Sequence, residues 1–326
     1  MKMRNKIEVP GFVAKCLAIC FYLCSVSVSA QSVEKENILL RSYEPNTLGY
    51  SFDDNDVAYM DFKLSLKYPI LHGVVNWTNQ YVKILPMPYF AFSGRFGQYI
   101  GTRNSSPVIG KRFNPKVFFR YSYSDADTLD FAYAHESNGQ KIDNEQVFQE
   151  FQNDLVAQGE QARFANDYIS RGWDYLQVVF KNEYNQKAVY KFSSYVDLKY
   201  FLKTGAFQGG LEEYNSWENS TIGKTRSQVD GVSLLLKYKY GRRYEIPLFG
   251  EEYIPFNGVK FAAMFTTGYK DTLSYRTYRV EATTIFWDLP IMFWYSRGYN
   301  SDLVDYYKDV TSYGISFELK TFIDEV

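Results

Sequence analysis

The sequence predicts an all-β protein, a twelve-stranded antiparallel transmembrane β-barrel with a short helical segment in one extracellular loop. Two observations lead to this prediction. Apolar and polar residues alternate in many short segments, and aromatic residues make up 19% of the chain while charged residues still make up 22%. No apolar run long enough for a membrane helix follows the N-terminal segment. Any membrane-spanning structure must therefore be a closed barrel, because only helices and barrels satisfy their backbone hydrogen bonds in lipid.

The first thirty residues have the order of a secretory signal peptide. Three basic residues precede an apolar stretch, and small residues then end at Ala30. A membrane anchor is the competing interpretation, but Lys15 interrupts the stretch, which is shorter than the roughly 20 residues of a spanning helix. We therefore expect a signal peptide over residues 1–30 and one barrel domain over residues 31–326.

All three cysteines, Cys16, Cys20 and Cys24, lie in the expected signal peptide. The mature chain would contain none, which excludes disulfides and thiol chemistry. A lipid-attached cysteine is an alternative, although Ile19 and Leu23 stand where small residues are expected. The formal net charge is -1 and the signal segment is basic, so the mature chain is mildly acidic, which argues against nucleic acid as a partner.

Residues 60–68 illustrate the alternation, with apolar residues at every even position and polar residues between them. Such a pattern is typical of a strand with one apolar face, which would meet lipid in a barrel or a core in a soluble sandwich. The predicted strands begin near Thr47, Val57, Gln80, Phe113, Leu129, Arg171, Ala188, Asp230, Gly258, Arg276, Ile291 and Val310. Aromatic residues near strand ends, Tyr99, Trp287 and Tyr299, resemble interfacial girdles and favour the barrel.

The connections between strands differ in length. We expect short periplasmic turns at 125–127 and 185–187, and longer extracellular loops at 140–169, 203–229 and 300–309. Residues 144–163 have apolar residues at helical spacing and predict a loop helix at the barrel rim.

The strand that begins at Leu129 carries the candidate chemistry. His135 and Ser137 are two residues apart and so lie on one face, where an imidazole can activate a hydroxyl as a nucleophile. On the next predicted strand, Asp174 interrupts the apolar face and could orient the ring. The alternative is that these are ordinary polar residues near a strand end, because His-x-Ser is short and frequent. The other histidine, His72, is expected in a solvated turn.

Longer motifs surround these residues. Residues 135–139 read His-Glu-Ser-Asn-Gly and residues 170–174 read Ser-Arg-Gly-Trp-Asp. Further segments are Tyr-Glu-Pro-Asn at 43–46, Ser-Ser-Pro at 105–107, Gly-Tyr at 298–299 and Leu-Val-Asp-Tyr at 303–306. In combination, from about Tyr43 to the C-terminus, the sequence resembles the outer membrane phospholipase A family.

The resemblance implies a serine, histidine and asparagine triad on the outside of a twelve-stranded barrel. His135 would be the base and Ser137 the nucleophile, and the third position falls on Asp174, where the family has asparagine. We expect retained activity with a different pH profile. The loop at 140–169 is also longer than the family's usual one, and the chain does not end on an aromatic residue.

The resemblance also implies calcium, bound by the backbone carbonyl of Gln140, by Ser170 and by Ser105 from a partner subunit. These are the hard oxygen ligands that Ca²⁺ prefers. The expected function is calcium-dependent hydrolysis of phospholipid acyl esters, as phospholipase A1 and A2 with lysophospholipase-type activity, in the bacterial outer membrane. The active state would be a reversible homodimer. The alternatives are a catalytically decayed structural or pore-forming barrel and a soluble secreted esterase.

Overall fold

The computed structural model describes residues 39–54, 58–79, 85–99, 108–124, 126–184, 189–207, 218, 222–248, 252–286 and 289–319. The expected signal peptide, the expected calcium ligand Ser105 and the C-terminal residues 320–326 lie outside these ranges. The strands are β1 (Arg41–Ser42), β2 (Asn46–Asp53), β3 (Ala58–Pro69), β4 (Met87–Tyr99), β5 (Val108–Ser122), β6 (Thr128–Ser137), β7 (Gly172–Tyr184), β8 (Tyr190–Phe201), β9 (Gly231–Leu248), β10 (Glu252–Gly268), β11 (Arg276–Phe286), β12 (Leu289–Gly298) and β13 (Val310–Leu319). The helices are α2 (His72–Asn79), α3 (Glu145–Ala157), the 3-10 helix η1 (Ala162–Tyr168) and α4 (Arg226–Val229).

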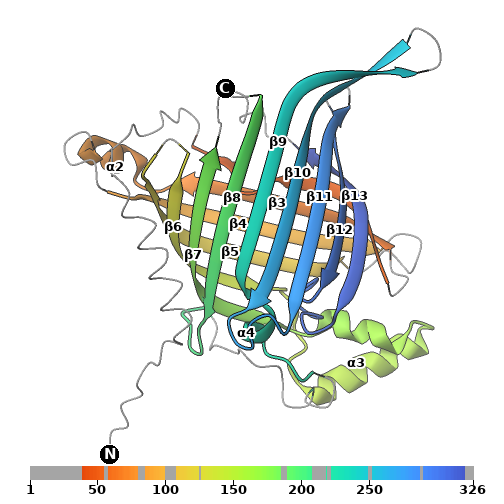
Figure 1. Cartoon of the computed structure of the whole chain (residues 1–326). Helices are drawn as coiled ribbons and strands as arrows, with labels where there is room; N and C mark the ends of the chain where they lie inside the picture. The colour runs from red at the N-terminus through yellow and green to blue at the C-terminus, as the bar shows by residue number, and fades with distance from the viewer. Residues whose placement is uncertain are drawn as a thin grey trace, which may run out of the picture.

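Strands β2 to β13 form a closed barrel (Figure 1). Each strand pairs antiparallel with its neighbour in sequence, β13 pairs with β2, and the pairing of β3 with β4 continues the ring. Within the described residues, the two-residue strand β1 pairs with β3 alone and adds no further strand to the ring. The twelve-stranded antiparallel barrel predicted from alternation is therefore confirmed.

Most expected strand starts are within two residues of the observed ones, but three are wrong. Strand β4 begins at Met87 and not near Gln80, because α2 occupies part of the preceding connection. Strand β10 begins at Glu252, and Gly258 lies inside it at a β-bulge with a φ of +82°. A bulge glycine interrupts the alternation of apolar and polar residues, so in the sequence the second half of the strand looks like the start of a new one. Strand β5 likewise begins earlier, at Val108 rather than Phe113.

The outer surface of the barrel is apolar and its interior is polar. On β12 the outward Phe293 and Tyr295 are exposed, while Met292 and Trp294 point inward and are buried. Inside the barrel, buried acidic side chains form ion pairs with basic ones. For example, Arg120 Nη2 lies 2.6 Å from Asp130 Oδ2. A soluble sandwich has the reverse arrangement, with its apolar set in a core. The sandwich and the soluble esterase are therefore wrong alternatives, and paired side chains occupy the interior.

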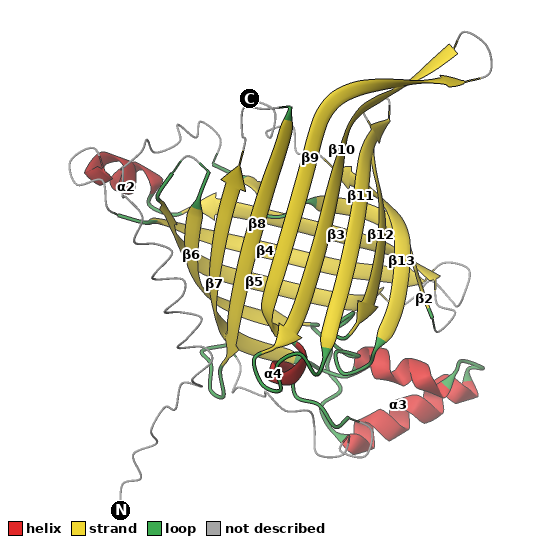
Figure 2. Ribbon diagram, in the orientation of Figure 1, coloured by secondary structure: helices red, strands yellow, loops and turns green. Residues whose placement is uncertain are grey.

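The helices α3, η1 and α4 gather at one end of the barrel, with the connection between β12 and β13 (Figure 2). This is the end that the sequence predicts to be extracellular. Helix α3 lies in the stretch where a loop helix was expected, and η1 begins at the end of that stretch. The Asn144 side chain caps α3 by accepting a hydrogen bond from the Val147 amide. None of the helices in the described ranges is long and apolar enough to cross a membrane.

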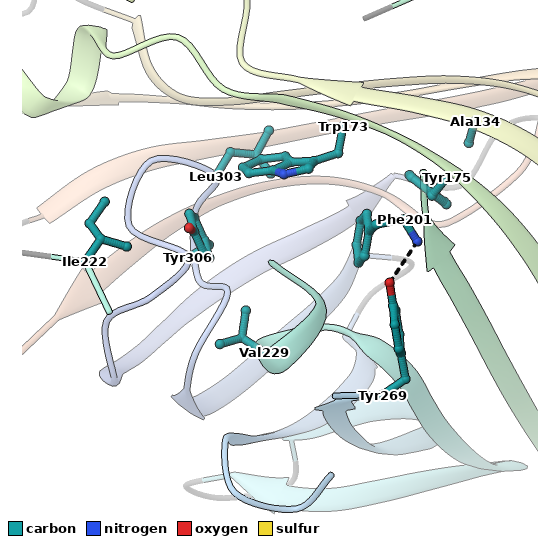
Figure 3. Close-up of a cluster of buried hydrophobic side chains, with 9 residues drawn as sticks. All are labelled: Ala134, Trp173, Tyr175, Phe201, Ile222, Val229, Tyr269, Leu303 and Tyr306. Carbon is teal, nitrogen blue, oxygen red and sulfur yellow. Dashed lines mark hydrogen bonds between the residues drawn. The ribbon is translucent and has the colours of Figure 1, made fainter. Parts of the chain in front are cut away.

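A cluster of aromatic and aliphatic side chains packs inside the barrel at this end (Figure 3). Trp173 of β7 meets Tyr306 edge-on with ring centroids 5.5 Å apart, and the Phe201 amide donates a hydrogen bond to the Tyr269 hydroxyl at 3.3 Å. Loop residues thus close on the start of β7, which carries part of the candidate site.

Candidate active site

Pairing of β6 with β7 brings His135 and Asp174 together. The two residues are direct register partners, and His135 Nδ1 lies 2.6 Å from Asp174 Oδ1. A carboxylate in this place favours the tautomer with hydrogen on Nδ1 and leaves Nε2 available as a base. The His135 side chain is 14% exposed and that of Asp174 is fully buried. Two of the three expected triad residues are therefore in contact.

Ser137 lies two residues beyond His135 on the same face of β6, opposite Gly172 of β7, and is half-buried. Among the described residues, no hydrogen bond joins the Ser137 hydroxyl to the His135 ring. A serine and its base often come within hydrogen-bonding distance only when substrate is bound. The arrangement has the elements of a serine hydrolase site, namely a hydroxyl beside a histidine whose ring a carboxylate orients.

Glu136, between these two residues, points into the barrel, and sequence analysis missed its role. It lies 2.5 Å from Arg226 Nη2 of α4, and the same nitrogen lies 3.0 Å from Asp230 Oδ2. The side chains of Glu136, Arg226 and Asp230 are all buried. The interior ion pair therefore anchors the strand end whose outer face carries His135 and Ser137. Strand alternation alone could have indicated that Glu136 points inward.

Asn138 joins the two segments from which calcium ligands were expected. Its side chain donates a hydrogen bond to the Ile169 carbonyl at 2.7 Å and accepts one from the Arg171 amide at 2.9 Å. The chain then turns at Gly139, whose φ of +61° favours glycine. Gln140 and Ser170 thus lie at opposite ends of the single connection between β6 and β7, whose two ends Asn138 holds together.

The donor chemistry at the two ends of this connection fits Ca²⁺, because a carbonyl and a hydroxyl are hard oxygen ligands. The expected third ligand, Ser105, lies outside the described residues. Within the described ranges, no group of three histidine, cysteine, aspartate or glutamate side chains could hold a metal.

The expectation that His72 lies in a turn is wrong. This residue is part of α2 and not of a turn, and its Nε2 lies 2.9 Å from the Asn76 side-chain nitrogen. An i to i+4 contact of this kind belongs to the helix itself. His72 lies outside the candidate site, whose histidine is His135.

No family model matches the chain, and no curated protein matches it. Among solved structures, the outer membrane phospholipase dimer of Salmonella typhi with bound calcium is similar, with a TM-score of 0.54 and 15% identity over 88% of this chain and 94% of that one. Outer membrane phospholipase A from Escherichia coli has the same TM-score and identity over 87% of this chain and 100% of that one. An active-site mutant of the Escherichia coli protein has a TM-score of 0.52 and 16% identity, over 89% of this chain and 95% of that one. At identities this low, the structural likeness shows a shared fold and no more. This chain is a bacterial outer-membrane β-barrel with the fold of outer membrane phospholipase A.

Proposed function

We propose that this protein hydrolyses the acyl ester bonds of phospholipids in the outer membrane. The observation that carries the proposal is the 2.6 Å contact between His135 and Asp174 on the outer face of the barrel, with Ser137 two residues further along. A buried carboxylate against a histidine on a lipid-facing surface is costly unless it serves a function. Its place beside a serine supports ester hydrolysis.

In this mechanism the Ser137 hydroxyl attacks the ester carbonyl as His135 Nε2 takes its proton. Asp174 holds the proton on Nδ1 and stabilises the imidazolium. His135 then gives its proton to the leaving alcohol. In the second step His135 takes a proton from a water molecule, which attacks the acyl-enzyme, and returns that proton to the Ser137 oxygen as the fatty acid leaves. The chain thus supplies both the nucleophile and the proton shuttle.

The substrate would reach Ser137 laterally from the membrane. The outer faces of β6 and β7 continue from the site with exposed apolar residues, among them Phe131 and Leu176. An acyl chain can lie along such a surface without meeting water. Phospholipids with one or two acyl chains are therefore the proposed substrates, as for phospholipase A1, A2 and lysophospholipase activity.

Calcium would be held by the Gln140 carbonyl, Ser170 and, from a second copy of the chain, Ser105. A bound cation there supplies positive charge that stabilises the developing oxyanion. Asn138 supports this assignment because it ties together the two ends of the β6–β7 connection, on which Gln140 and Ser170 lie. The proposal includes a reversible homodimer as the active state, because one copy alone would not complete that ligand set.

The test is fatty-acid release from mixed phospholipid–detergent micelles by the purified protein, with calcium and with a chelator. We expect calcium-dependent release that Ser137→Ala abolishes. A matched control is Ser296→Ala, on β12, six strands from β6 in either direction around the barrel. Full activity in Ser137→Ala would refute the nucleophile, and no release by the wild type under any condition would favour the decayed structural barrel.

A further inference from the structure

Asp174 occupies an unusual place for a charged residue. It belongs to the outward, apolar face of β7, together with Leu176, yet its side chain is fully buried. A carboxylate next to hydrocarbon is strongly disfavoured unless it is paired and its lone pairs accept hydrogen bonds. Groups other than His135 must therefore shield the Asp174 carboxylate from lipid and donate hydrogen bonds to it.

Both carboxylate oxygens of Asp174 accept hydrogen bonds. Oδ1 faces His135 Nδ1, while Oδ2 accepts from the Tyr133 hydroxyl at 2.7 Å and from the Phe207 amide at 2.9 Å. The Tyr133 hydroxyl in turn accepts from the Ala206 amide at 2.6 Å. Tyr133 lies on β6, two residues before His135, whereas Ala206 and Phe207 belong to the connection after β8. Two separate parts of the chain thus converge on one oxygen.

Gly205 permits this close approach. A Cβ atom at this position would lie 1.7 Å from Asp174 Oδ2 and 2.3 Å from Cγ, so no other residue fits without displacement. The Leu202 amide also donates to the Asp174 carbonyl at 2.9 Å, which continues the contact along the connection. The backbone of residues 205–207 therefore lies directly against the carboxylate.

Phe207 completes the cover. Its ring centroid lies 5.9 Å from those of both Tyr133 and His135, and the residue is 72% exposed. It thus presents apolar surface to the membrane while its own amide binds Asp174. The carboxylate is separated from lipid by a segment that is apolar outside and hydrogen-bonding inside.

We infer that Tyr133 and residues 205–207 form a clamp that holds the Asp174 carboxylate in the orientation needed to position His135. The inference rests on the proposed function, because it assigns the clamp to that same site. None of the clamp residues touches the reacting atoms, so they are positioning residues. The clamp also explains how a charged third residue can exist on the lipid-facing side of the barrel.

Two variants test the clamp through activity. Tyr133→Phe removes one donor to Oδ2, and Gly205→Ala displaces the segment. The matched controls are Tyr295→Phe, an exposed tyrosine on β12, and Gly223→Ala, in the same inter-strand connection, where a Cβ atom would meet nothing within 4 Å. Hydrogen bonds to charged groups are strong, so we expect the loss of one in this network to lower kcat about ten- to a hundredfold, with KM little changed. The controls should keep wild-type activity.

A spectroscopic measurement tests it without activity. The chain has 2 histidines, so His72→Gln protein with ¹⁵N-labelled histidine reports on His135 alone. We expect a low-field Nδ1 proton from the bond to Asp174, which Tyr133→Phe or Gly205→Ala shifts or broadens and the controls leave unchanged. If that resonance and kcat both stay at their wild-type values in Tyr133→Phe, the inference is overturned, even where Gly205→Ala fails to fold. A wild type that releases no fatty acid would instead refute the proposed function, while the resonance still decides the clamp.

Discussion

Asp174→Asn is the most informative single change in this protein. Asparagine has the same shape as aspartate and is the residue that the family resemblance implies at this position. In this structure, however, Asp174 meets donors on both sides, with His135 at Oδ1 and the Tyr133 hydroxyl and Phe207 amide at Oδ2. Asparagine can accept at one of these sides only, because its second group is itself a donor.

The size of the effect follows from those contacts. With the amide oxygen toward His135, the NH₂ group faces the Phe207 amide, which loses its hydrogen bond to a charged acceptor at a cost of about 1.5–3 kcal/mol in folding free energy. The hydrogen bond to His135 also loses its charge, which removes about 1.5–3 kcal/mol as the imidazolium forms. We therefore expect kcat to fall by roughly ten- to a hundredfold. The opposite rotamer would place a donor against Nδ1 and favour the wrong tautomer.

The assay is calcium-dependent fatty-acid release from mixed micelles, alongside denaturant unfolding in detergent. Asp174→Ala is the reference for complete loss of the carboxylate. A double variant, Asp174→Asn with Tyr133→Phe, should lose less than the two single changes combined, because both disturb one network. Asp174→Asn with wild-type kcat and wild-type unfolding free energy would refute the reasoning, since it would mean that neither Phe207 nor the charge matters.

Two further predictions concern stability. Arg226→Met leaves Glu136 without its buried partner and should lower the unfolding free energy by about 3–5 kcal/mol, measured by denaturant titration in micelles. Burial alone would raise the pKa of Asp230, but Lys199 and Arg226 outweigh it and hold the pKa below its usual range. The stability that this carboxylate contributes is therefore present above its unfolded pKa of about 4 and lost as the pH falls further, so acid should remove part of the effect of Arg226→Met. On the lipid-facing side, Phe293→Lys near the middle of β12 should cost about 2–4 kcal/mol in refolding into bilayers, whereas Phe293→Leu should cost far less; equal costs would contradict an outward, lipid-exposed Phe293.

Strand alternation was sufficient to predict the barrel and most of its strand positions. A residue and its neighbour two positions along share a face, so the side that each strand presents to lipid is encoded locally. The same rule placed His135 and Ser137 together, and the motifs indicated Asp174 as the third residue. The local pattern could not predict α2 or the bulge at Gly258. A short helix and a single extra residue interrupt the alternation of apolar and polar residues over only a few positions.

The environment of the site was decided by tertiary structure alone. Arg226 reaches Glu136 across 90 residues, and Phe207 reaches Asp174 across 33. Such contacts depend on the closure of the ring and on the path of each loop, which no short sequence pattern records. The sequence by itself determined the barrel and indicated the candidate residues of the site, whereas the fold determined that the carboxylate on the lipid-facing side is covered, hydrogen-bonded and directed at the histidine.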